Sequence, residues 1–126
     1  MELVVDQNII FKDTGGRYLI LYNMQSKKWN KLFQFQFQEK ELYYRITGIQ
    51  VRGDDLYDQG TVCDSRINDL GGSQVVNDAE ENGVWRVDIK TGQKEQVTNT
   101  VYCWIYILDG ILYGIDYGKY EVIPIK

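Results

Sequence analysis

Carboxylates are the side chains with the clearest chemical potential in this 126-residue sequence. Eight of them lie between residues 54 and 81, where Arg66 is the single basic residue. The eight are Asp54, Asp55, Asp58, Asp64, Asp69, Asp78, Glu80 and Glu81. Carboxylates serve general acid–base catalysis, bind divalent cations, or attract basic partners. No spacing within the set selects one catalytic pair.

The acidity of the chain is local. Its net charge is -4, yet residues 1–53 carry eight Lys or Arg against five acids, and residues 82–126 carry five of each. An acidic segment repels nucleic acid and anionic membranes, and it speeds encounters with a basic protein. We therefore take the eight carboxylates as candidate partner-binding residues. A solvated loop and a divalent-cation site are the alternatives.

Residues 78–83 place oxygen side chains before a glycine, as calcium loops do. An EF-hand loop counted from Asp78 needs a bidentate Glu at its twelfth position, and that position is Ile89. A solvated turn that opens a strand is the simpler interpretation, so no metal site is predicted.

Most catalytic arrangements are excluded by composition. The chain has no His, which removes the commonest general base, metal ligand and Ser-His or Cys-His partner. Gly71-Gly72 is not followed by Lys-Ser or Lys-Thr, so it is no phosphate-binding loop. Carboxylate-pair catalysis stays open, but we expect a non-catalytic protein without a cofactor.

The two cysteines, Cys63 and Cys103, are forty residues apart and make no disulfide framework. Free thiols are typical of a reducing compartment. The first residues lack a basic segment followed by an apolar one, and no run approaches the roughly 20 apolar residues of a membrane helix. These features predict a cytoplasmic location.

Residues 82–115 organise the remainder of the chain. Residues 84–89 alternate as a half-buried strand does, Thr91-Gly92 suits a turn, and residues 95–98 return. Residues 101–108 are apolar or aromatic throughout, which predicts a strand covered on both faces. Asp109-Gly110 is a strong hairpin signal.

Earlier in the chain, strands are predicted at 8–11, 18–22, 29–33, 44–51 and 56–57, with turns at 13–16, 25–28 and 52–55. Residues 33–38 alternate Phe and Gln, which predicts a strand with rings in the core and amides in solvent. Exposed at an edge, this strand would instead pair with a second copy or a partner. The acidic residues 54–83 are expected to form a long loop, with short strands at 61–63 and 74–76.

Internal repeats link these elements. Four apolar positions recur at a spacing of 56: Ile49, Val51, Leu56 and Tyr57 match Ile105, Ile107, Leu112 and Tyr113. Residues 19–32 recur at a spacing of 65 as residues 84–97, and a third echo at 102 relates residues 11–20 to 113–122. The repeat predicts that Ile49 and Ile105 are equivalent buried residues, as are Leu56 and Leu112.

The repeated pattern resembles a β-propeller blade, most closely the low-density-lipoprotein-receptor-like repeats of bacterial proteins and more loosely Kelch-type blades. The carrying residues are Ile105, Asp109, Gly110, Leu112 and Tyr113, then Trp85, Arg86, Val87, Asp88, Thr91 and Gly92. Propellers have four to eight blades, more than this chain can supply. The expected fold is therefore all-β and antiparallel, with about ten short strands in one domain of propeller-like repeats. A partial propeller, a sandwich and an open barrel remain alternatives.

Three functions fit these features. The first is a non-catalytic protein-interaction module, in its sharpest form a small acidic inhibitor of a basic, nucleic-acid-handling protein. The second is a carbohydrate or small-ligand binder, because Tyr and Trp present flat apolar faces with a polar handle. The third is an enzyme that uses carboxylates. Self-association through an edge strand is compatible with the first.

Overall fold

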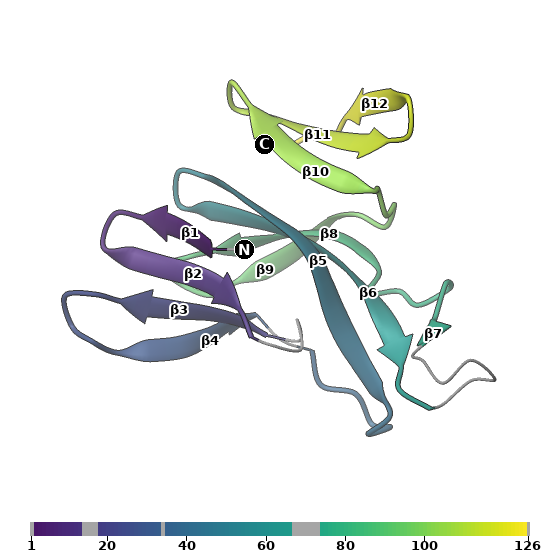
Figure 1. Ribbon diagram of the computed structural model, residues 1–126, viewed down its shortest axis with the longest axis horizontal. Coiled ribbons are helices and arrows are strands. Elements are labelled where there is room, and N and C mark those ends of the chain that lie inside the picture. The colour runs from purple at the N-terminus through teal and green to yellow at the C-terminus, as the bar shows by residue number, and fades with distance from the viewer. Residues whose placement is uncertain (1, 14–17, 34, 67–73, 126) are drawn as a thin grey trace.

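The fold is all-β and antiparallel, as predicted. The computed structural model describes residues 2–13, 18–33, 35–66 and 74–125 (Figure 1). The strands are β1 (Glu2–Val5), β2 (Asn8–Lys12), β3 (Leu19–Asn23), β4 (Trp29–Phe33), β5 (Leu42–Arg52), β6 (Asp55–Asp64), β7 (Gln74–Val75), β8 (Gly83–Asp88), β9 (Lys94–Thr98), β10 (Trp104–Leu108), β11 (Ile111–Asp116) and β12 (Lys119–Val122). The described part of the chain contains no helix that could span a membrane.

The strands form three sheets in chain order. Sheet A has the order β1-β2-β3-β4, sheet B the order β5-β6-β8-β9, and sheet C the order β10-β11-β12. The short strand β7 pairs with β6 beside the main path of sheet B. Neighbouring strands follow one another in the chain and pair antiparallel, except that residues 65–82, with the short strand β7, lie between β6 and β8. No described sheet closes into a barrel.

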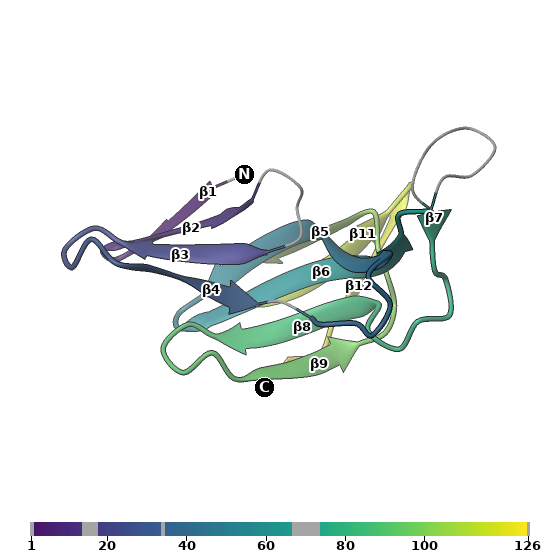
Figure 2. The ribbon, with the colours of Figure 1, turned by 90° about the horizontal axis from the view of Figure 1, so that it is seen from below.

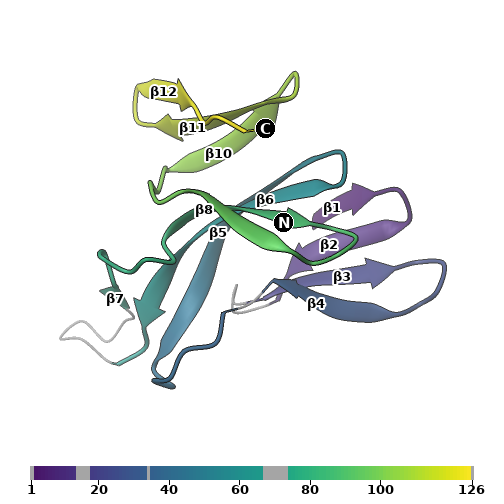
Figure 3. The same cartoon turned by 180° about the vertical axis from the view of Figure 1, so that it is seen from behind.

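Sheet B lies between the other two sheets, as Figures 2 and 3 show from two directions. One apolar cluster joins sheet A to sheet B through buried residues such as Ile10, Leu19 and Leu56. A second cluster joins sheet B to sheet C through Tyr57 and Leu112, among others. Because both faces of sheet B are covered, all eight central residues of β6 are buried.

The internal equivalences at spacings of 56 and 65 are confirmed. Ile49, Ile105, Leu56 and Leu112 are all buried. The turns of the hairpins β3-β4 and β8-β9 are also of the same type. The side-chain oxygens of Asn23 and Asp88, which are 65 positions apart, each accept hydrogen bonds from the backbone N–H groups two and three residues later. A register shift follows the first paired residue of both β3 and β8.

The third echo, at a spacing of 102, is out of register by one residue. The first turns of the three sheets begin at Asp6, Gly53 and Asp109, all with positive φ. Asp6 and Asp109 are 103 positions apart. A shift of one residue moves a side chain to the opposite face of a sheet. The sequence match of Phe11 with Tyr113 therefore paired residues on faces that are not equivalent: at a spacing of 103, Tyr113 corresponds to Ile10, which points to the opposite face from Phe11.

The first half of the chain departs from the prediction in two places. The described residues form twelve strands rather than about ten, because β1 was missed and the short strand β7 is added to the ten strands of the repeats. The Phe/Gln strand is wrong beyond Phe33, where β4 ends, because residues 35–38 form no strand. The predicted placement of the described side chains is nevertheless confirmed. Phe35 packs against Tyr44 and Trp85, with ring centroids 4.8 and 5.0 Å apart, while Gln36 and Gln38 are exposed. These residues therefore offer no edge for pairing.

The predicted acidic loop is also largely wrong. Strand β6 occupies residues 55–64 and is the central strand of the molecule. The expected short strands at 61–63 and 74–76 fall within β6 and on β7. The expected turn at 13–16, except Asp13, and the Gly71-Gly72 break lie outside the described residues.

Candidate functional site

The outer face of sheet C is the candidate functional site. Side chains alternate between the two faces of a strand, and directly paired residues share a face. The registers Trp104↔Ile115, Tyr106↔Tyr113 and Ile115↔Tyr120 place these side chains on one face. The complete set on this outer face is Trp104, Tyr106, Leu108, Ile111, Tyr113, Ile115, Tyr120 and Val122. Every member is apolar or aromatic.

The inner face of the same sheet packs on sheet B through Ile105 and Leu112, which leaves the outer face in solvent. Trp104, Tyr106 and Tyr120 are 57%, 50% and 72% exposed. The prediction that residues 101–108 are covered on both faces is therefore wrong for the isolated chain. A contiguous apolar surface of this kind is uncommon on a monomer and typically marks an interaction site.

The turns of sheet C hold this face in place. Asp109 and Gly110 have φ values of 52° and 77°, as the predicted two-residue hairpin requires. Arg52 of sheet B donates a hydrogen bond to the Gly110 carbonyl at 3.1 Å, and the backbone N–H of Ile107 donates to Gln50 Oε1 at 3.1 Å. Sheet C is thus fixed to the core by polar contacts as well as by its apolar inner face.

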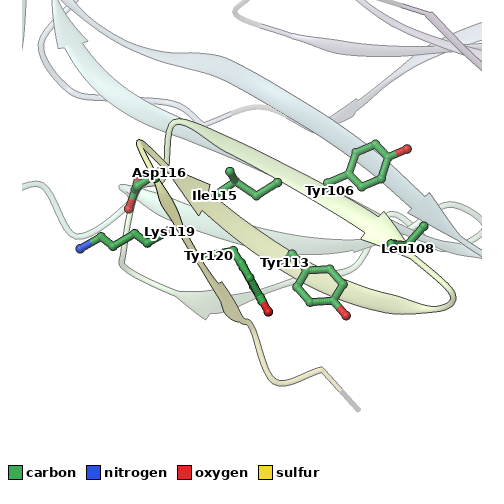
Figure 4. Close-up of a pocket in the computed structure, with 8 residues that line it drawn as sticks. Tyr106, Leu108, Tyr113, Ile115, Asp116, Lys119 and Tyr120 are labelled. Carbon is green, nitrogen blue, oxygen red and sulfur yellow. The ribbon is translucent and has the colours of Figure 1, made fainter.

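A shallow groove of about 530 Å³ crosses the outer face (Figure 4). Its lining consists of Tyr106, Leu108, Tyr113, Ile115, Asp116, Gly118, Lys119 and Tyr120. The rings of Tyr113 and Tyr120 are neighbours and meet edge to face, at a centroid distance of 5.8 Å and an interplanar angle of 73°. Asp116 and Lys119 place two charges at one end of an otherwise aromatic and aliphatic surface.

The groups beside the groove are arranged for binding rather than for nucleophilic chemistry. Asp116 Oδ1 accepts a hydrogen bond from the backbone N–H of Cys103 at 3.0 Å, which orients the carboxylate. Partial desolvation, followed by the hydrogen bond and charge of Asp116, raises the pKa of the Cys103 thiol. The thiolate is the nucleophilic form of cysteine, so this environment lowers its reactivity.

Tyr102 and Glu121 form the polar contact behind the groove. The Tyr102 hydroxyl donates to Glu121 Oε1. Desolvation, with the hydrogen bond and charge of Glu121, raises the pKa of Tyr102 to about 12. The phenol therefore stays protonated at neutral pH and holds the Glu121 carboxylate.

The eight predicted partner-binding carboxylates do not form one surface. Asp54 and Asp55 stand at the start of β6, where Asp54 lies 3.4 Å from Lys90 Nζ. Asp64 ends the same strand, roughly 30 Å away at about 3.3 Å per residue. It forms an ion pair with Arg66, whose hydrogen bonds lower the Asp64 pKa.

Asp58 cannot contact a partner, and its assignment as a surface residue is wrong. It is 0% exposed and lies in β6 between sheets A and B. Its Oδ1 accepts a hydrogen bond from the Tyr44 hydroxyl at 3.4 Å, while Oδ2 has no partner in the described residues. Desolvation raises its pKa well above the usual value.

Four of the eight predicted carboxylates remain. Asp78 and Glu80 are exposed and Glu81 is half-buried, all on the segment between β7 and β8, whereas Asp69 lies outside the described residues. Among the described residues no group of three or more Cys, Asp or Glu side chains is placed to hold a metal ion. The described acidic side chains of residues 54–81 therefore lie in four separate places: the two ends of β6, the core, and the connection between β7 and β8.

Sequence reasoning missed the aromatic face although its signal was present. The uninterrupted apolar run 101–108 indicates a strand that requires cover on both sides. Among the described residues sheet C is the last sheet, and nothing packs on its outer face.

No protein-family model, curated protein or solved structure matches this chain.

Proposed function

We propose that this chain is a non-catalytic protein-interaction module whose binding surface is the outer face of sheet C. The observation that carries the proposal is the composition of that face, where eight neighbouring side chains are all apolar or aromatic. Tyr and Trp are enriched at protein interfaces and dominate their energetics. The groove between Tyr106 and Tyr120 gives a partner side chain a place to insert.

The reactive groups of the described structure support a binding role over a chemical one. The chain has no His, Cys103 is held as a thiol, and Asp58 is enclosed in the core.

A protein surface that covers the aromatic face would gain hydrophobic free energy of about 25 cal/mol per Å² of apolar area buried.

Site-specific photo-crosslinking tests the proposal. A photoreactive phenylalanine analogue at Tyr106, in the centre of the face, is expected to form a covalent adduct with a protein in the source cell. The same analogue at Met24, an exposed apolar residue in the β3-β4 turn, is the control. Equal labelling at both positions, or none at Tyr106, would overturn the proposal.

The hypothesis that this protein is an acidic inhibitor of a basic protein rests on three carboxylates. Asp78, Glu80 and Glu81 are close in sequence, on the connection between β7 and β8. A basic protein partner that binds them would be lost when all three are changed to Lys and would be weakened by salt. Binding that survives the triple change would end this version and leave the aromatic face as the working surface.

A carbohydrate ligand is the second candidate, favoured by one observation. The groove joins the paired rings of Tyr113 and Tyr120 to the charged pair Asp116 and Lys119, so it offers both stacking faces and hydrogen-bonding groups. Titration with oligosaccharides should then change the fluorescence of Trp104, the one Trp on this face. Trp104→Phe should abolish the change, and no response at millimolar glycan would reject this candidate.

A further inference from the structure

We infer that the partner of the sheet C face is a second copy of this chain, docked head to tail against the outer face of sheet A. The inference rests on the proposed function, since it names the occupant of the same surface. It follows from what the two ends of the three-sheet stack expose and from how the sheets within the chain already pack.

Sheet A carries a second unpartnered apolar face. The registers Val4↔Ile9, Phe11↔Ile20 and Tyr22↔Trp29 place these side chains opposite the core-facing residues Ile10 and Leu19. The described side chains on this outer face are Val4, Ile9, Phe11, Ile20, Tyr22, Trp29 and Lys31. Six of the seven are apolar or aromatic, and Val4 and Trp29 are 67% and 65% exposed.

The same junction occurs twice within the chain. Sheet B packs on sheet A with the face that holds Ile49 and Leu56, and sheet C packs on sheet B with the equivalent Ile105 and Leu112. The opposite face of each preceding sheet receives them through equivalent residues, Leu19 in sheet A and Val84 in sheet B. Every junction therefore joins a receiving face to an inserting face.

One half of a junction is left on each outer sheet of the described structure. The outer face of sheet C occupies the position of the receiving face, because Tyr113 stands where Tyr57 stands in sheet B. The outer face of sheet A occupies the position of the inserting face, because Ile20 stands where Trp85 stands in sheet B. A third junction of the same kind thus needs sheet C of one copy and sheet A of another.

The exposed area is large enough for a stable contact. Large aromatic side chains bury about 150–250 Å² each, so Trp104, Tyr106 and Tyr120 still present roughly 350 Å² between them. A specific interface buries about 800 Å² per partner. These three rings alone provide nearly half of that area, and five further apolar side chains share the face.

Head-to-tail contacts close into a ring when the rotation between copies permits it. Two copies would form two identical junctions and a ring of six sheets, within the four to eight blades of a propeller. Closure covers all four terminal faces at once, so the pair gains two junctions for one association step.

Mass in solution tests this inference. Light scattering across a concentration series should give twice the monomer mass of 14.8 kDa for the wild type. Tyr106→Lys, on the sheet C face, and Trp29→Lys, on the sheet A face, should each give the monomer. Met24→Lys, an exposed apolar position on neither face, should leave the pair intact. Circular dichroism should show an unchanged strand content in all three variants.

The two single variants separate head-to-tail docking from its alternatives. A pair that Tyr106→Lys abolishes and Trp29→Lys leaves intact would mean that two sheet C faces meet, and it would overturn the inference. Assembly into larger polymers would overturn closure into a pair. A wild type that is monomeric at several hundred micromolar would also overturn it.

Crosslinking at Tyr106 separates failure of this inference from failure of the proposed function. An adduct with a different protein, together with a monomeric mass, would reject the second copy and keep the interaction surface. A monomeric mass without any adduct would reject both.

Discussion

Gln59 and Tyr102 are joined by two hydrogen bonds across the junction between sheets B and C. Gln59 Nε2 donates to the Tyr102 carbonyl at 2.9 Å, and the Tyr102 N–H donates to Gln59 Oε1 at 2.7 Å. The Gln59 side chain is fully buried in β6. A side-chain amide thus pairs with the backbone just before β10 as a neighbouring strand would, which fixes where sheet C begins.

Replacing Gln59 with Leu should therefore destabilise the fold strongly. The change leaves the N–H and carbonyl of Tyr102 buried without their partner. Each such group costs about 1–3 kcal/mol, so we expect a loss of about 2–5 kcal/mol in the free energy of unfolding, measured by urea denaturation. Gln36→Leu, at an exposed position, is the matched control and should change stability by less than about 0.5 kcal/mol. Equal effects of the two substitutions would contradict the role of the Gln59 amide.

The turn between β10 and β11 should tolerate Asn at position 110 but not Val. Gly110 has a φ of 77°, and no atom lies within 4 Å of the place a Cβ would take, so the backbone conformation alone decides the cost. A β-branched residue disfavours positive φ, whereas Asn accepts it. We expect Gly110→Val to cost about 1 kcal/mol or more and Gly110→Asn less, with melting temperature as the measurement. Equal melting temperatures would argue against strain at this position.

Gly114 should resist substitution for a different reason, which is lack of space. A Cβ at this position would lie 2.5 Å from the ring of Tyr102. Gly114→Ala must therefore displace the ring that caps the B–C junction, and we expect a cost of about 1–3 kcal/mol. Gly48→Ala is the graded control, because its Cβ would lie 3.3 Å from the Ile105 side chain, a longer contact than the 2.5 Å at Gly114. Thermal unfolding that ranks Gly48→Ala as the more harmful change would contradict this account.

Local patterns predicted most of the hairpins correctly because a hairpin depends on residues close in sequence. Asp109-Gly110 correctly predicted the turn between β10 and β11. The repeat at a spacing of 65 reflects two turns of the same type, in which the side chains of Asn23 and Asp88 accept equivalent backbone hydrogen bonds. The third echo was placed one residue out of register, at a spacing of 102 instead of 103. Because side chains alternate between the two faces of a strand, an error of one residue assigns every side chain to the wrong face.

The positions that could not be predicted depend on contacts between sheets. Asp58 was assigned to a surface loop because it is charged and follows a turn signal, yet sheet packing encloses it. Phe35 was placed on a strand by its alternation with Gln, yet it fills the space between Tyr44 and Trp85. The bare face of sheet C looked like a buried strand because sequence does not state which chain provides the cover.

The final prediction concerns Asp58, whose contribution to stability should fall as pH rises. Burial raises its pKa in the folded state above the unfolded value of about 3.8, so the fold prefers the protonated carboxyl. Its contribution to stability is fully present below the unfolded pKa. It is lost as pH rises from there through the folded pKa, and it is constant above that point. Asp58→Asn cannot ionise and removes this loss.

The difference in free energy of unfolding between Asp58→Asn and wild type isolates this residue. Asp64 and Asp88 have lowered pKa values and act in the opposite direction, but they are present in both proteins and cancel. We expect the difference to shift in favour of the variant as pH rises from 3 to 8, in urea titrations at each pH. A difference that stays flat would mean that Asp58 ionises in the folded core at its ordinary pKa. The Tyr44 hydroxyl would then have to stabilise the charge far better than its 3.4 Å hydrogen bond indicates.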